Sequence, residues 1–118
     1  MRSRLQRSQA VLRLLAFMLG VFVMIPASYA TYDANVIGVV TELLTYPGAN
    51  QPILFHISAQ PTSHPACQPY FFALPADVDV KAIYARLLLA RATGESVNIG
   101  YDSQGSCVSG WIRAWRVG

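Results

Sequence analysis

Residues 36–46 read VIGVVTELLTY, a run rich in β-branched residues that ends on a tyrosine. β-Branched and aromatic residues are enriched in strands, so this run predicts a long first strand. Gly38 lies inside it, and a glycine within a strand often marks a bulge or a bend. A long strand with a bend is typical of a sheet that curls around a small barrel.

Past this strand, turn residues alternate with short apolar runs. Two prolines, a glycine and an asparagine between 47 and 52 predict a turn. Three prolines within residues 60–69 cannot all lie in a hydrogen-bonded ladder, so this segment is expected to be a loop. Residues 103–110 form a second expected loop. The remaining strands are predicted at 53–57, 70–74, 97–101 and 111–117.

Residues 80–94 change to a helical period. Asp77 or Asp79 is expected to cap the start of this helix, and Gly94 stands where a left-handed residue ends one. Apolar residues recur between them at three- and four-residue spacing, at Val80, Ile83, Tyr84, Leu87 and Leu88.

A second set of apolar residues lies largely off that stripe of the predicted helix. A helix with one buried face normally shows a cleaner polar face. Two interpretations stay open: the second side packs on a neighbouring subunit, or its small residues are simply exposed. The set consists of Ala82, Ala85, Leu89 and Ala92.

The predicted order of elements is strand, strand, strand, helix, strand, strand. This is the order of the OB-fold, a five-stranded, partly open Greek-key barrel. The fold class expected is therefore mainly β with one helix, as a small five-stranded OB-like barrel. A plain antiparallel sheet with one packed helix would give the same order.

Residues 1–30 have the three regions of a secretory signal peptide. Four arginines without an acidic residue precede the apolar run Leu14–Ile25, and the segment Ser28-Tyr29-Ala30 offers small residues for cleavage. The run is too short for a membrane anchor, which needs roughly 20 apolar residues. We therefore expect a cleaved leader, a single mature domain at 31–118 without a membrane span, and a secreted or periplasmic location.

Removal of the leader changes the charge of the chain. The whole chain carries a net charge of +3, but residues 31–118 contain five basic and six acidic residues, which leaves −1. Nucleic-acid binding needs clustered basic residues that displace counterions from phosphates. Nucleic acid is therefore not an expected partner.

Cys67 and Cys107 are the two cysteines of the chain. Export would place them where a disulfide persists, and a small domain needs such a cross-link because its core is marginal. A reactive thiol pair is the alternative, but the spacing is not that of a C-x-x-C motif. A structural disulfide is predicted.

Few residues suggest catalysis. His56 lies in an apolar strand and His64 in a proline-rich loop, and no pattern marks a Ser–His–acid set or a phosphate-binding loop. A zinc site would need three or four ligands. Asp33 and Asp102 are the only candidates for paired carboxylates. We expect no enzyme activity, no metal and no cofactor.

The last predicted strand offers better material for binding. Trp111, Arg113 and Trp115 share one face, because residues two apart on a strand point the same way. This set can stack on sugar rings or bases. In the alternative, one tryptophan lies in the core and Arg113 covers the other as a cation–π pair.

Two blocks of the sequence resemble the B subunit of subtilase cytotoxin. The first is Gly38-Val39-Val40 with the following turn and strand, and the second runs from Ala85 through Thr93-Gly94 to Tyr101-Asp102. Together they cover about half of residues 31–118. Small secreted proteins without an accompanying toxin chain are similar to this subunit in the same way.

The resemblance implies an OB-fold domain that assembles as a ring of five and binds sialylated glycans. Asp33 matches an acidic residue before the first strand, and Tyr101 matches a tyrosine at the end of the fourth. The serine before Gly-Val-Val is replaced by Ile37, which removes a hydroxyl from the expected site. The predicted function is an exported, non-catalytic module that binds a glycan or a protein and forms oligomers. The alternative is an exported structural or inhibitory protein with a protein partner and no small ligand.

Overall fold

The computed structural model describes residues 32–77 and 79–118. The predicted leader, residues 1–30, lies outside the described residues. The described part is mainly β with one helix, which confirms the expected class. Its elements are β1 (Ala34–Leu44), β2 (Ile53–Ile57), β3 (Gln68–Leu74), α2 (Val80–Thr93), β4 (Ser96–Tyr101), β5 (Cys107–Val108), β6 (Trp111–Arg113) and β7 (Arg116–Val117).

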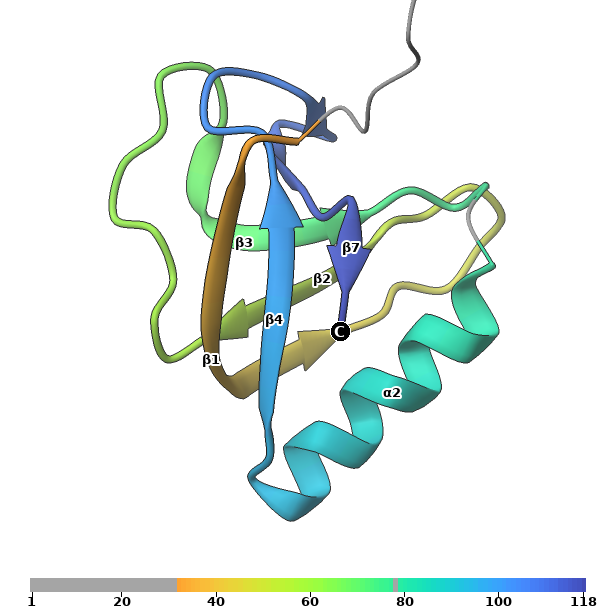
Figure 1. Ribbon diagram of the computed structural model, residues 1–118. Helices are drawn as coiled ribbons and strands as arrows, with labels where there is room; N and C mark the ends of the chain where they lie inside the picture. Colours follow the sequence, from red (N-terminus) through yellow and green to blue (C-terminus); the bar gives the residue numbers. More distant parts are fainter. Residues whose placement is uncertain (1–31, 78) are drawn as a thin grey trace, which may run out of the picture. The chain divides into compact units, whose positions relative to one another are not determined.

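The long strand β1 joins the two halves of the sheet. Its first half, Ala34–Val39, pairs with β4, and its second half pairs with β2, so that β1 curves from one neighbour to the other (Figure 1). The register shifts between Val40 and Glu42, a few residues after the predicted bend. Gly38 allows the backbone of Ala59 to approach β1 closely, because a Cβ at position 38 would lie 3.0 Å from the backbone nitrogen of Ala59.

The sheet is not the five-stranded barrel that the order of elements suggested. It has seven strands in the order β5-β6-β3-β2-β1-β4-β7 and is not closed. The expected fifth strand, 111–117, is split because its two central residues bond to different strands. The N–H of Ala114 donates to Ala73 on β3, and that of Trp115 donates to Gly100 on β4. The parallel pairing of β3 with β6 excludes the plain antiparallel sheet as well.

Helix α2 ends as predicted, on Gly94 with φ of 71°. Asp79 holds the N-cap position but makes no side-chain capping hydrogen bond. Leu87 is fully buried, as its place in the apolar stripe predicts, whereas Leu88 is 43% exposed. The prediction for Leu88 was wrong because its direction differs from that of Leu87 by about 100°. Ala90 takes the buried position instead.

The core lies between the inner face of the sheet and α2. Phe55 and Phe72 are fully buried, with ring centroids 5.6 Å apart. Leu87 reaches this cluster from the helix, and Ile99 and Ile112 reach it from β4 and β6. Each such side chain contributes about 1.5–3 kcal/mol when it leaves water. Among residues 32–77 and 79–118, no helix has the length and apolarity to cross a membrane.

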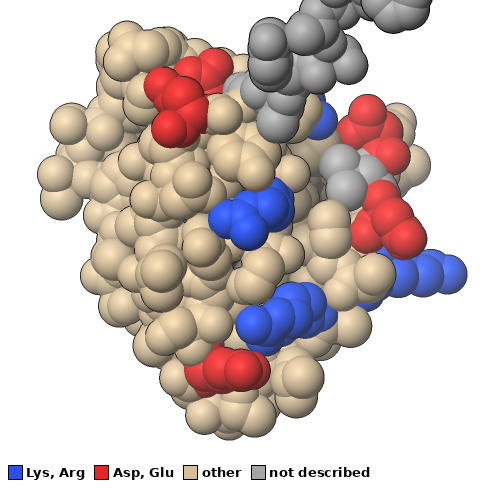
Figure 2. Space-filling view, viewed as in Figure 1, with Lys and Arg blue, Asp and Glu red and all other residues tan. Residues whose placement is uncertain are grey.

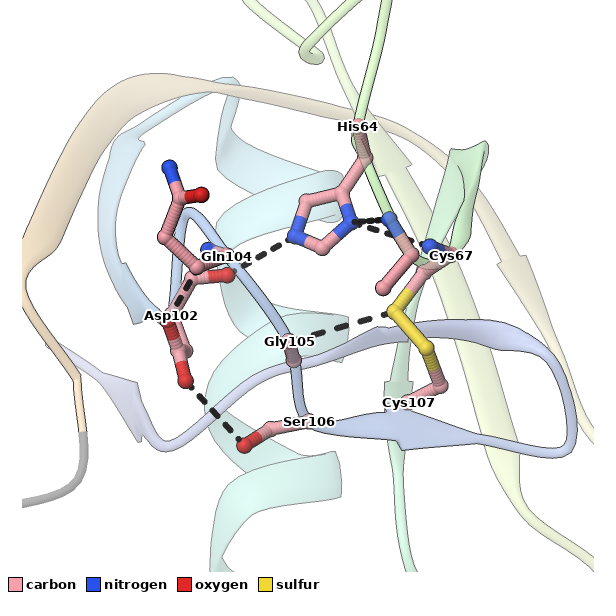
Figure 3. The surroundings of a disulfide bond; sticks show 8 residues. His64, Cys67, Asp102, Gln104, Gly105, Ser106 and Cys107 are labelled. Carbon is pink, nitrogen blue, oxygen red and sulfur yellow. Dashed lines mark hydrogen bonds between the residues drawn. A yellow bond between two sulfur atoms is a disulfide. The ribbon is translucent and has the colours of Figure 1, made fainter.

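The predicted disulfide is confirmed. Cys67 and Cys107 are bonded with their Cα atoms 5.6 Å apart, and they tie the start of β3 to β5. His64 braces the same region (Figure 3). Its Nδ1 accepts from the backbone N–H of Cys67 at 2.9 Å, and its Nε2 donates to the carbonyl of Asp102 at 2.8 Å. This disulfide fits an extracellular or periplasmic location.

Candidate functional site

Four rings form a continuous series over β2, β3 and β6, and we call this series the aromatic row. His56 and Tyr70 have ring centroids 4.7 Å apart, and so do Tyr70 and Phe71. Phe71 meets Trp111 edge-on at 5.1 Å. Tyr70 is 50% exposed, whereas the other three are half-buried.

Strand alternation and a bulge place these rings outside the core. Phe55 and Phe72 point inward, so their neighbours His56 and Phe71 point to the outer face. Gln68 pairs with Trp111 and Phe72 with Ile112, so β3 has three residues where β6 has none. This irregularity lets Tyr70 and Phe71, which are adjacent in sequence, both belong to the row.

A hollow of about 240 Å³ opens beside Tyr70, and it belongs to the β2–β3 side of the sheet. Gln60 fixes its wall with both ends of its amide, because Oε1 accepts from the N–H of Ile57 at 3.3 Å and Nε2 donates to the carbonyl of Pro69 at 2.8 Å. The hollow is lined by His56, Gln60, Pro61, Thr62, Pro69 and Tyr70.

Two hydrogen bonds orient the rings of the hollow. The hydroxyl of Tyr70 donates to Oε1 of Glu42 at 2.7 Å. This bond, together with the negative charge of Glu42, raises the pKa of Tyr70. Nδ1 of His56 lies 2.7 Å from Oγ1 of Thr41, which also donates to the carbonyl of His56 at 3.1 Å.

The expected set Trp111, Arg113 and Trp115 divides between two environments. Trp111 belongs to the aromatic row through Phe71. The guanidinium of Arg113 lies 3.6 Å from the centroid of the Trp115 ring, which is the cation–π pair of the alternative interpretation. Nε of Arg113 and Nε1 of Trp115 are buried without a hydrogen-bond partner. Of these three side chains, Trp111 is therefore the one that belongs to the aromatic row.

The residues carried over from the resemblance have other partners. Asp33 accepts from the N–H of Ser103 at 2.8 Å and from its hydroxyl at 2.7 Å. These bonds lower the pKa of Asp33. Tyr101 packs against the core, with its ring centroid 5.4 Å from that of Phe72. Ile37 is 62% exposed. Asp33 thus holds the loop after β4, and Tyr101 lines the edge of the core.

The two histidines have different surroundings. Both ring nitrogens of His64 contact backbone groups, so this ring holds two loops together. Asp102 is also occupied, because it accepts from the N–H of Gln104 at 2.9 Å and from the hydroxyl of Ser106 at 3.4 Å. His56 alone borders the hollow. In the part of the chain that the structure describes, no three His, Cys, Asp or Glu side chains could hold a metal ion together.

Patterns in the sequence did not identify Tyr70, Gln60 or Thr62 as site residues. Tyr70 was expected only as a strand residue, and the other two lay in or at the edge of a proline-rich loop. The available signal was the Pro69-Tyr70-Phe71 stretch, since a proline at the start of an apolar strand is often found at a bulge or an edge. Basic and acidic side chains alternate on the face shown in Figure 2 rather than forming a basic patch. Comparison with family models, curated proteins and solved structures found no match.

Proposed function

We propose that this protein is a non-catalytic binding module whose aromatic row binds a carbohydrate. One observation carries the proposal: the half-exposed ring of Tyr70 borders a hollow of about 240 Å³ and continues into three further rings. Aromatic rings supply a large contact area, and three of the four rings here, those of His56, Tyr70 and Trp111, also have a polar atom.

The dimensions of this surface favour a chain of sugars over a single small molecule. The hollow is smaller than the roughly 300–1,000 Å³ of sites that enclose drug-sized ligands, so it suits one ring of a longer ligand. The aromatic row extends across three neighbouring strands, β2, β3 and β6. Strands lie about 4.8 Å apart, so the row offers a second and a third position beyond the hollow.

The site proposed differs from the one that the toxin-subunit resemblance implies. Asp33 already accepts a hydrogen bond from Ser103, and Tyr101 packs on Phe72. Tyr70, in contrast, is 50% exposed. We therefore place the glycan on the aromatic row and not at the start of β1. Export through residues 1–30 remains part of the proposal, and amino-terminal sequencing of the protein from culture supernatant and periplasm tests it.

A glycan array followed by calorimetry tests the carbohydrate proposal. Tyr70→Ala removes the ring beside the hollow and is expected to weaken binding by about tenfold, since a stacked ring contributes about 1–3 kcal/mol. Tyr46→Ala is the matched control, because Tyr46 is exposed to nearly the same degree, 52%, but lies outside the row. Equal affinity in the two variants, or no glycan bound by the wild type, would refute the proposal.

A second candidate function is association through α2. Leu88 and Leu89 are 43% and 56% exposed and adjacent on this helix. Exposed apolar side chains of this size favour contact with another protein or with a further copy of the chain. Light scattering at micromolar concentration tests self-association, and a wild-type protein that is monomeric, with the same mass as Leu89→Ser, would refute it. A pull-down with Leu89→Ser as the control would then test for a separate protein partner.

A further inference from the structure

The polar atoms that Tyr70 and Glu42 present beside the hollow accept hydrogen bonds and do not donate them. A tyrosine hydroxyl has one proton, and that of Tyr70 is used in its bond to Oε1 of Glu42. The phenolic oxygen can therefore only accept from a ligand. An ionised carboxylate has no donor at all, so the second oxygen of Glu42 offers another acceptor beside the ring.

His56 adds a further acceptor. Oγ1 of Thr41 has one proton, and its contacts with both Nδ1 and the carbonyl of His56 are satisfied together when Thr41 donates to the carbonyl and Nδ1–H donates to Thr41. The Nε2 atom of neutral His56 is then an acceptor. One of the two amide protons of Gln60 is used on the carbonyl of Pro69, and the other, like the hydroxyl of Thr62, is a neutral donor in the lining. A ligand that fills the acceptors of Tyr70, Glu42 and His56 must bring donors of its own.

The charge next to the hollow is negative and is not balanced by an ion pair. Within residues 32–77 and 79–118, the one salt bridge joins Arg86 to Glu95, so Glu42 forms none. Arg91 donates to the backbone carbonyl of Thr41 and not to the carboxylate of Glu42. None of the residues that line the hollow in this described part is a lysine or an arginine.

Arg113 is too far away to neutralise this carboxylate. Arg113 lies on β6, and the sheet order β6-β3-β2-β1 puts three strand spacings between it and Glu42. Three spacings amount to about 14 Å. This separation exceeds the Debye length of about 8 Å at physiological ionic strength, so Arg113 is largely screened from Glu42.

Resting on the proposed carbohydrate function, we propose that the hollow binds a protonated amino sugar, with the ammonium group beside Glu42 and the apolar ring face on Tyr70. An ammonium group supplies three donors and a positive charge to a site that has acceptors and a negative charge. A cation close to an aromatic face gains a further electrostatic attraction. A sialylated glycan brings a carboxylate and is disfavoured here.

Calorimetry with three oligosaccharide probes tests this inference. Glucosamine oligomers carry the amine, N-acetylglucosamine oligomers of equal length lack the charge, and a sialylated trisaccharide carries a negative one. Titrations are run at about pH 7, where a primary amine is still largely protonated, a glutamate is ionised and a histidine of ordinary pKa is mostly neutral. Glu42→Gln keeps the size of the side chain and removes its charge. Glu95→Gln is the control, because it removes the same charge beside β4.

The wild type is expected to bind the glucosamine oligomer about fivefold more tightly than the acetylated one. Glu42→Gln removes that preference and leaves the acetylated probe within about twofold, whereas Glu95→Gln changes neither. The amino-sugar inference is wrong if the glucosamine and N-acetylglucosamine oligomers bind equally and Glu42→Gln has no effect. It is also wrong if the sialylated probe binds best. In both cases the carbohydrate function stands. If no probe binds, or Tyr70→Ala changes nothing, the proposed function itself is wrong.

Discussion

Removal of the disulfide should lower the stability of this domain by about as much as the loss of a large buried side chain. Cys67 and Cys107 are separated by 40 residues in sequence. Closing a loop of this length in the unfolded chain contributes about 4 kcal/mol in the chain-entropy model. Domains of ordinary stability unfold with only about 5–15 kcal/mol, so the loss is a large share of the total.

The assay is urea unfolding of the double variant Cys67→Ala/Cys107→Ala, followed by tryptophan fluorescence and circular dichroism. With a slope of about 1–2 kcal/mol per M of urea, the midpoint should fall by about 2–4 M. In a thermal scan the same loss corresponds to a decrease in Tm of about 15–30 °C for a domain of under 100 residues. Reduced wild-type protein provides the comparison, because it keeps both sulfur atoms.

A decrease of less than about 1 kcal/mol in the unfolding free energy would refute this reasoning. It would mean that the bonds of His64 to Cys67 and Asp102 already hold the two loops together without the disulfide. A larger effect in the double variant than in the reduced protein would have a separate cause, since Cys67 is 6% exposed and its sulfur fills part of the core.

Three further measurements test particular contacts. Leu87→Ala should destabilise the fold by about 2–5 kcal/mol in urea unfolding, because Leu87 is fully buried, while Leu88→Ala should stay within about 0.5 kcal/mol of wild type; equal effects would contradict the orientation of α2. Hydrogen bonds from Ser103 lower the pKa of Asp33. The contribution of the Asp33 carboxylate to folding stability is therefore present above the unfolded pKa and is lost as the pH falls through the folded pKa. The difference in unfolding free energy between wild type and Asp33→Asn should shrink below about pH 4. Glu42 raises the pKa of Tyr70 through its hydrogen bond and its charge, so phenolate absorbance should show a lower pKa for this tyrosine in Glu42→Gln, and an unchanged titration would show that the bond is absent.

Local patterns in the sequence were sufficient for several elements. The β-branched run at 36–46, the helix ending on Gly94 and the disulfide were all predictable, because each depends on residues that are close in sequence or on a unique cysteine pairing. The predicted barrel failed at Ala114 and Trp115, where the backbone changes partner from β3 to β4. Such a change depends on long-range hydrogen bonds that composition does not reveal.

The candidate site shows the same division. Trp111 was predicted from its residue type and its strand position. Its neighbours His56, Tyr70 and Phe71 come from other strands, and the register of β3 against β6 shifts between Gln68 and Phe72 where Phe71 meets Trp111. A pattern of residues along one strand cannot specify this register. The partner of Glu42, 28 residues away, was likewise not visible in the sequence.

The most direct test of the central claim is chemical-shift mapping of the 15N-labelled protein during titration with glucosamine oligomers. Ligand bound in the hollow should shift the backbone amides of Gln60, Thr62 and Tyr70 and the indole signal of Trp111. In Tyr70→Ala, the changes at Gln60, Thr62 and Trp111 should need about tenfold more ligand. Shifts confined to Tyr101 and Ser103 would instead place the ligand at the end of β4, and they would contradict a binding site on the aromatic row.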